Sequence, residues 1–179
     1  SFSKGHSASY AVESYQSLYL KAHFPLEFMV GVINNFGGFY RTEFYVHEAR
    51  MSGAAVHAPC VNHSSYLTDI IGRDVYLGFI HVAGLEQQIA ESFLEERERG
   101  GAFDGLDDFS RRVAIPLEQL RLLVRIGAFR FTGRTKKQLL WDLHMLLGEE
   151  KKTVIRQELF SVEQETYVLP ELFHDPYDD

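Results

Sequence analysis

The sequence lacks the features of a secreted, disulfide-bonded or membrane-spanning protein. Its single cysteine, Cys60, excludes an internal disulfide, which agrees with a reducing compartment. No apolar run approaches the roughly 18 to 20 residues that a membrane-spanning helix needs, and no secretory leader is recognisable. These absences predict a cytoplasmic protein that does not have a membrane as a partner.

The chain does contain enough apolar residues for a core. Of its 179 residues, 45% are hydrophobic and 13% are aromatic, so global disorder is not expected. The length suits one domain of moderate size or two small ones. Because the sequence starts on a helix-like pattern without a methionine, we expect it to be a piece of a longer protein.

Apolar residues at intervals of three and four predict a mainly helical fold with little β-structure. Residues 54–67 have no helical period and contain Pro59, so they are expected to form a loop or a short extended segment. Residues 74–80 are expected to include a small strand. Helices are expected over residues 7–22, 27–35, 40–51, 85–97, 106–113, 116–126 and 135–147.

The distribution of charge predicts a phosphate-binding face within a nearly neutral body. Residues 149–179 carry nine acidic and three basic side chains, whereas residues 1–148 carry a net charge of only −1. Residues 111–137 hold one acid, Glu118, and eight bases. Such a block is typical of a surface that binds nucleic acid, and the alternative is a solvated helix face. The bases are Arg111, Arg112, Arg121, Arg125, Arg130, Arg134, Lys136 and Lys137.

Two glycine-bearing turns beside predicted helices indicate tandem helix-hairpin-helix units. Glycines let a backbone approach a phosphate, and a helix N-terminus supplies free N–H groups and the positive end of the helix dipole. The first turn covers residues 78–84, and the second lies between the helices expected at 116–126 and 135–147. Two such units bind the backbone of duplex DNA without reading bases. The predicted DNA-binding residues are Gly78, His81, Gly84, Arg130, Arg134, Lys136 and Lys137.

No complete catalytic or metal site is evident in the sequence. His57, Cys60 and His63 have the spacing H-x2-C-x2-H around a proline, but a zinc site normally takes four ligands with paired spacing, so a structural turn is the main interpretation. No nucleophile elbow and no paired-aspartate motif for two metal ions appears. We therefore expect no catalytic residue, no metal and no cofactor in this chain.

The opening stretch FSKGHSASYAVESYQSLYLKAHFPLEFM resembles the fingers domain of the bacterial DNA polymerase III alpha subunit, whose pattern is F-x-K-x-H-x-x-x-Y followed by K-A-H-(aromatic)-P-x-E-F-M. The stretches HEARMSGAAVHAPCVNHSSY, LGFIHVAGLEQQIAESFLEERERGGAFDGLDDFSRRV and LVRIGAFRFTGRTKKQLL resemble later parts of that family in the same order. The resemblance covers residues 1–148. It implies fingers over 1–53, a helix-hairpin-helix region over 54–148 and an irregular acidic tail over 149–179.

The resemblance also implies a nucleotide site. Lys4 and His6 would contact phosphate oxygens of an incoming deoxynucleoside triphosphate, and Tyr10 would pack on its base or sugar. The alternative is that Tyr10 belongs to the core and Lys4 only caps a helix. The family's catalytic aspartates and their Mg²⁺ ions belong to a palm domain that this sequence does not contain. The chain by itself is therefore expected to be inactive.

Two departures from the family pattern affect the predicted sites. The family's first hairpin reads G-x-G-A-I-K-G-V-G, whereas residues 76–84 have lost the first and third glycines and carry His81 in place of the lysine. The family's clamp-binding peptide reads Q-x-x-(L/M)-F. Leu159 and Phe160 match its end, but Gln157 lies one place late. The sliding clamp is thus a further expected partner. A stand-alone helical nucleic-acid-binding or scaffold module remains the alternative function.

Overall fold

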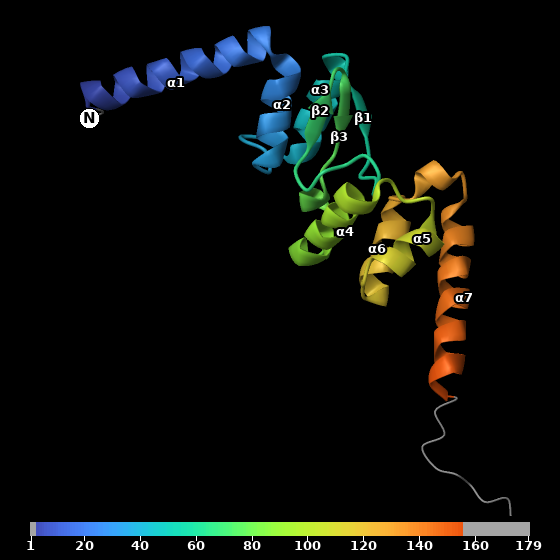
Figure 1. Cartoon of the computed structure of the whole chain (residues 1–179). Helices are drawn as coiled ribbons and strands as arrows, with labels where there is room; N and C mark the ends of the chain where they lie inside the picture. Colours follow the sequence, from blue (N-terminus) through green and yellow to red (C-terminus); the bar gives the residue numbers. More distant parts are fainter. Residues whose placement is uncertain (1–2, 156–179) are drawn as a thin grey trace, which may run out of the picture. The chain divides into compact units, whose positions relative to one another are not determined.

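The computed structural model describes the backbone of residues 3–155 and the side chains of residues 3–146 (Figure 1). In this part of the chain seven α-helices, two short 3-10 helices and one three-stranded sheet confirm the mainly helical fold. In chain order the elements are α1 (Lys4–His23), α2 (Pro25–Asn34), α3 (Thr42–Met51), β1 (Ala55–His57), β2 (Asp69–Ile71), β3 (Asp74–Tyr76), η1 (Phe79–His81), α4 (Gln87–Gly100), α5 (Leu106–Arg112), α6 (Leu117–Ile126), η2 (Arg130–Thr132) and α7 (Lys136–Ile155).

The first two helices meet at a single residue, Phe24 (Figure 1). Ser3 caps α1 because its hydroxyl accepts a hydrogen bond from the His6 amide at 3.3 Å. Pro25 stops α1 and then occupies the first position of α2, where a missing N–H costs nothing. Every described residue of α1 is exposed, so this helix contributes nothing to the core.

The sheet is small and mixed. Its order is β1-β3-β2, with β1 parallel and β2 antiparallel to β3. The sequence predicted β3 and an extended segment at β1, but β2 was missed because three residues are too few to show an alternating pattern. Gly72 makes the turn between β2 and β3 with a positive φ of 64°.

Two hydrophobic clusters form the core, and both lie in the compact unit Ser1–His144. The first is built on α2 and includes Met29, Ala49 and Val75. The second, called here the phenylalanine cluster, joins η1, α4, α5, α6 and the start of α7. Its rings Phe79, Phe93, Phe103, Phe109 and Phe129 meet at centroid distances of 4.8 to 5.6 Å. The domain boundary expected at residue 53 stays a prediction.

Two helix boundaries differ from the sequence expectation. Helix α4 begins at Gln87 rather than Leu85, because Leu85 donates its amide back to Val82 in the preceding turn. Helix α7 continues to Ile155, although its end was expected at residue 147. The apolar repeat stops at residue 147, which is why the helix was expected to end there. The helix continues because Glu149, Glu150 and Lys151 are good helix formers.

Candidate nucleic-acid interface

At the second predicted hairpin the structure has two helices, α6 and α7, joined by a short turn. Helix α6 ends at Gly127, which takes the left-handed conformation (φ 80°) and donates its amide to carbonyls of the last turn. The chain then passes through η2 and Gly133 before α7 begins. Thr135 and Gln138 form a capping box, with the Thr135 amide 2.9 Å from Oε1 of Gln138 and the Gln138 amide 3.3 Å from Oγ1 of Thr135.

Five of the eight bases in residues 111–137 are held by protein groups. Arg111 and Arg112 pair with Asp108, Arg112 also pairs with Glu96, and Arg121 pairs with Glu118. The Asp104 amide and then Arg112 hold the pKa of Asp108 below its usual range. Because each ion pair carries no net charge, these arginines add little to a phosphate-binding field.

Two predicted DNA-binding residues belong to this held group. The guanidinium of Arg130 donates to the carbonyls of Ala58 and Pro59, which ties the second hairpin to the loop after β1. Arg134 forms a two-point ion pair with Asp142 on α7, with N–O distances of 2.6 and 3.0 Å. Both side chains are therefore already bonded within the chain.

The three remaining cations of the block differ from the paired arginines. Arg125, Lys136 and Lys137 are exposed, and no carboxylate pairs with them in the part of the chain that the structure describes. The Lys136 side chain lies close to Gly127, where an added Cβ would be 3.5 Å from its Cε. Two of the predicted residues, Lys136 and Lys137, are thus brought together with the hairpin, and Arg125 joins them as a residue that the prediction did not single out.

The first predicted hairpin is built differently. Gly78 is buried, and a Cβ there would lie 2.5 Å from the Thr68 nitrogen and from the Tyr66 carbonyl oxygen. This glycine allows close packing of two backbone segments rather than an approach to phosphate. Gly84 has a positive φ of 85° and is exposed, but its carbonyl accepts a hydrogen bond from the Gln119 side chain at 2.9 Å. Gln119 also accepts from the Glu86 amide at 3.1 Å, so α6 braces this turn.

His81 is half-buried, and its side chain is already bonded within the chain. Its Nε2 lies 3.1 Å from Oγ1 of Thr68, and its ring meets Phe36 edge-on with centroids 5.5 Å apart. Burial lowers the pKa of His81. A lowered pKa disfavours the charged imidazole, so His81 is a poor substitute for the lysine that the family pattern has at this position.

The predicted nucleotide-binding residues lie on the exposed helix α1. The rings of His6 and Tyr10 meet edge-on at 6.1 Å, as expected for neighbours four residues apart. Tyr10 is 55% exposed, so the alternative that it belongs to the core of this chain is wrong. Lys4 precedes His6 by two positions and therefore lies on a different side of the helix.

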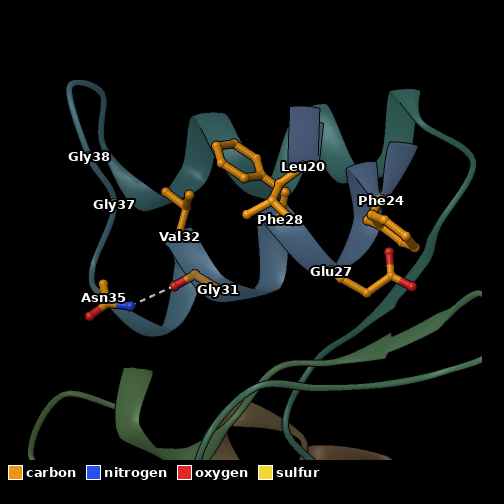
Figure 2. Close-up of a pocket in the computed structure, with 9 residues that line it drawn as sticks. All are labelled: Leu20, Phe24, Glu27, Phe28, Gly31, Val32, Asn35, Gly37 and Gly38. Atoms are coloured by element: carbon orange, nitrogen blue, oxygen red, sulfur yellow. Dashed lines mark hydrogen bonds between the residues drawn. The ribbon is translucent and has the colours of Figure 1, made fainter. Parts of the chain in front are cut away.

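An apolar groove lies where α1 meets α2 (Figure 2). It encloses about 410 Å³ and is lined by Leu20, Phe24, Phe28 and Val32 together with Gly37 and Gly38. None of the predicted nucleotide-binding residues lines it. Its lining supplies little polarity, so the groove has no means of binding a triphosphate.

The H-x2-C-x2-H segment forms a structural turn. His57 bonds Asp74 at 2.7 Å, and both His57 and His63 stack on Tyr76 at centroid distances of 4.8 and 5.7 Å. Cys60 is buried. Among the described residues no group of three or more His, Cys, Asp or Glu side chains is arranged to bind a metal ion. The clamp residues Gln157, Leu159 and Phe160 lie outside the described residues.

Gln119 and Arg97 are bracing residues that sequence reasoning missed. Arg97 on α4 donates to the carbonyls of Val61 and Ser64 at 2.9 and 2.8 Å, and burial lowers its pKa. Both residues form hydrogen bonds with groups that lie 33 to 36 positions away in the sequence. No local pattern signals such contacts, because a polar residue on a helix usually faces water.

Comparisons with known proteins identify the family of this chain. A family model described as a helix-hairpin-helix motif matches residues 53–139. The DNA polymerase III subunit alpha of Thermus aquaticus is 35% identical over 150 residues, which are 82% of this chain and 12% of that protein. The chain belongs to the DNA polymerase III alpha family. This confirms the family that the sequence motifs indicated and disfavours an unrelated scaffold module.

Other polymerases of the family match over nearly the same region. The DNA polymerase III subunit alpha of Deinococcus radiodurans is 33% identical over 156 residues, which are 85% of this chain and 12% of that protein. The error-prone DNA polymerase of Mycobacterium bovis is 34% identical over 143 residues, or 78% of this chain and 13% of that protein. The chain thus spans 12% to 13% of the length of these relatives. Within the described residues, no helix is both long and apolar enough to cross a bilayer.

Proposed function

We propose that this chain binds the backbone of duplex DNA through its second hairpin, as a part of a bacterial DNA polymerase. The observation that carries the proposal is the N-terminus of α7, where Lys136 and Lys137 occupy the first two helical positions and no acidic residue lies in the first turn. Cations at this end oppose the helix dipole and cost stability, unless an anion binds there. A phosphate removes that cost and is held by lysines and backbone amides together.

The arrangement suits binding without base recognition. Two lysines and Arg125 supply charges, and a glycine-bounded turn supplies close backbone approach, but none of these groups presents the paired donor and acceptor pattern that reads a base edge. The helix-hairpin-helix model that matches residues 53–139 supports DNA binding by this region. The proposal is tested by comparing the duplex affinity of the chain with that of a Lys136→Gln, Lys137→Gln variant, which is expected to lose most of its binding.

DNA-directed DNA synthesis is the activity that we propose for the longer polymerase, supported by the names of its relatives. In that setting residues 1–53 would be part of the fingers, and Lys4, His6 and Tyr10 would contact the incoming deoxynucleoside triphosphate. The exposure of all three is compatible with that role. By resemblance to the family, Mg²⁺ would be held by the palm domain of the longer polymerase. A cytoplasmic location is the corresponding expectation.

The sliding clamp is proposed as a second protein partner. Leu159 and Phe160 match the apolar end of the family's clamp-binding peptide within an acidic segment. Two buried apolar anchors contribute about 3 to 6 kcal/mol before ordering costs, so about micromolar binding is the most to expect. Titration of the chain with the cognate clamp tests this, with a Leu159→Ala, Phe160→Ala variant as control. Equal binding by both proteins would remove the clamp as a partner of this segment.

A further inference from the structure

A second groove lies between α3 and the first hairpin, far from the lysines of α7 in sequence. It encloses about 600 Å³, which is within the range of about 300 to 1,000 Å³ for small-ligand sites. One wall is the face of α3 with Glu43, Val46 and Arg50, which share a side of the helix because they are spaced by three and four residues. Ile80 and His81 of η1 line the other wall, and Phe36 lies beside His81.

Phe36 has an unusual backbone for a large residue. Its φ is 60°, and it is the one non-glycine residue with a positive φ in the part of the chain that the structure describes. A bulky side chain is strained there, and such strain is typical of functional sites. The turn is held by two hydrogen bonds, since the Asn35 side chain donates to the Gly31 carbonyl at 2.8 Å (Figure 2) and the Gly37 amide donates to the Val32 carbonyl at 2.9 Å. The strained turn leaves the Phe36 ring 61% exposed.

The two rings of the groove offer apolar surface without charge. Phe36 and His81 meet at an interplanar angle of 73°, so a flat group that stacks on one ring meets the other at its edge. Burial lowers the pKa of His81, which disfavours its charged form, and its Nε2 lies 3.1 Å from Oγ1 of Thr68. This end of the groove therefore suits a flat aromatic group and not a phosphate.

The charges of the groove are separated along α3. Glu43 and Arg50 are seven residues apart, which is about 10 Å along a helix. Both are exposed, and neither has an ion-pair partner among the described residues. The Phe36 turn adjoins the start of α3, because a Cβ on Gly37 would lie 3.4 Å from the Thr42 nitrogen. The aromatic and acidic groups thus share one end, and Arg50 lies toward the other.

A nucleotide has the same separation of chemistry. Its base is flat and carries amino groups that donate to a carboxylate, whereas its phosphate is an anion that binds arginine. Bases within a duplex are covered by their neighbours, so only an unpaired base can stack on a protein ring. We propose that this groove binds an unpaired nucleotide of single-stranded DNA, with the base on Phe36 and the phosphate on Arg50.

The proposal also accounts for the altered first hairpin. His81 stands where the family pattern has a lysine, and its ring meets Phe36 edge-on. This change removes a cation from the turn and adds a ring to the groove. The site is separate from the second hairpin, so the two proposals can be tested on the same protein by different variants.

The test is fluorescence anisotropy of the full 179-residue chain with a short labelled single strand and with the matching duplex. Phe36→Gly removes the ring and relieves the backbone strain, so folding is not impaired. It is expected to weaken single-strand binding about tenfold and to leave duplex binding unchanged. Arg50→Gln is expected to reduce the salt slope for the single strand by about 0.7. Phe39→Ala is the matched control, since that ring is 92% exposed and does not line the groove.

A 2-aminopurine base in the single strand supplies an independent readout, because stacking quenches its fluorescence. Quenching by the parent and not by Phe36→Gly supports the site. Equal affinity and equal quenching by the two proteins would overturn it and assign the groove to protein contacts. Loss of single-strand binding only in the Lys136→Gln, Lys137→Gln variant would also overturn it, while leaving the duplex proposal intact.

Discussion

The salt dependence of duplex binding measures how many cations of the basic block meet phosphate. For B-DNA, each neutralised phosphate adds about −0.9 to the slope of log K against log salt concentration. If all eight bases in residues 111–137 took part, the slope would be about −7. The structure pairs five of them with protein groups and leaves Arg125, Lys136 and Lys137. We therefore expect a slope of about −3 for the parent chain and about −1 for Lys136→Gln, Lys137→Gln.

The measurement is fluorescence anisotropy with a labelled duplex at several salt concentrations between about 50 and 200 mM. A variant with Arg111→Gln and Arg121→Gln is the matched control, because it removes the same number of charges from the same block. Those arginines lie beside carboxylates, so the control slope is expected to stay close to the parent value. A parent slope near −7, or a larger change in the control than in the lysine variant, would refute the assignment of the interface to the start of α7.

Three further predictions concern the nucleotide site, the packing of the first hairpin and pH. In the longer polymerase, Lys4→Ala and His6→Ala are each expected to lower the catalytic efficiency for nucleotide without loss of DNA affinity, because each variant loses a contact that contributes about 1.5 to 3 kcal/mol. Unchanged steady-state efficiency would assign these residues to structure. Gly78→Ala is expected to lower the free energy of unfolding in urea by about 1 to 3 kcal/mol, whereas Gly31→Ala, a helical site with nothing within 4 Å, should not lower it. Because burial lowers the pKa of His81, the unfolded chain binds a proton first as the pH falls below about 6.5. The melting temperature should therefore fall with acidification in the parent and fall less in His81→Gln, and identical pH profiles would contradict this.

The sequence was sufficient for the elements that depend on local signals. Apolar spacing located the seven α-helices of residues 3–155, and Pro25 and Gly127 mark real helix boundaries. These signals are reliable because a proline lacks an N–H and a glycine accepts a left-handed conformation wherever they occur. The family motifs were equally local, and the comparisons confirmed the family that they indicated.

Tertiary contacts decide which charged and polar side chains are bonded within the chain. Eight bases in one block look alike in sequence, yet Arg130 bonds carbonyls 71 and 72 residues away and Arg134 bonds Asp142. Lys136 and Lys137 differ from these arginines because the fold places no carboxylate or carbonyl acceptor beside them among the described residues. Sequence analysis therefore identified the basic segment but could not tell which of its side chains the fold leaves without an ion-pair partner.

The first hairpin shows the same division. The positions of the glycines indicated the turn. In the structure, however, Gly78 allows close packing against the backbone of residues 66–68, and His81 contacts Thr68 and Phe36. Those partners come from two other segments of the chain, brought together by a sheet whose strands have three residues each. Local propensity determined where the chain turns and where it is helical. Packing between distant segments determined which surfaces remained free to bind a ligand, because a side chain that is already bonded within the protein is no longer available to one.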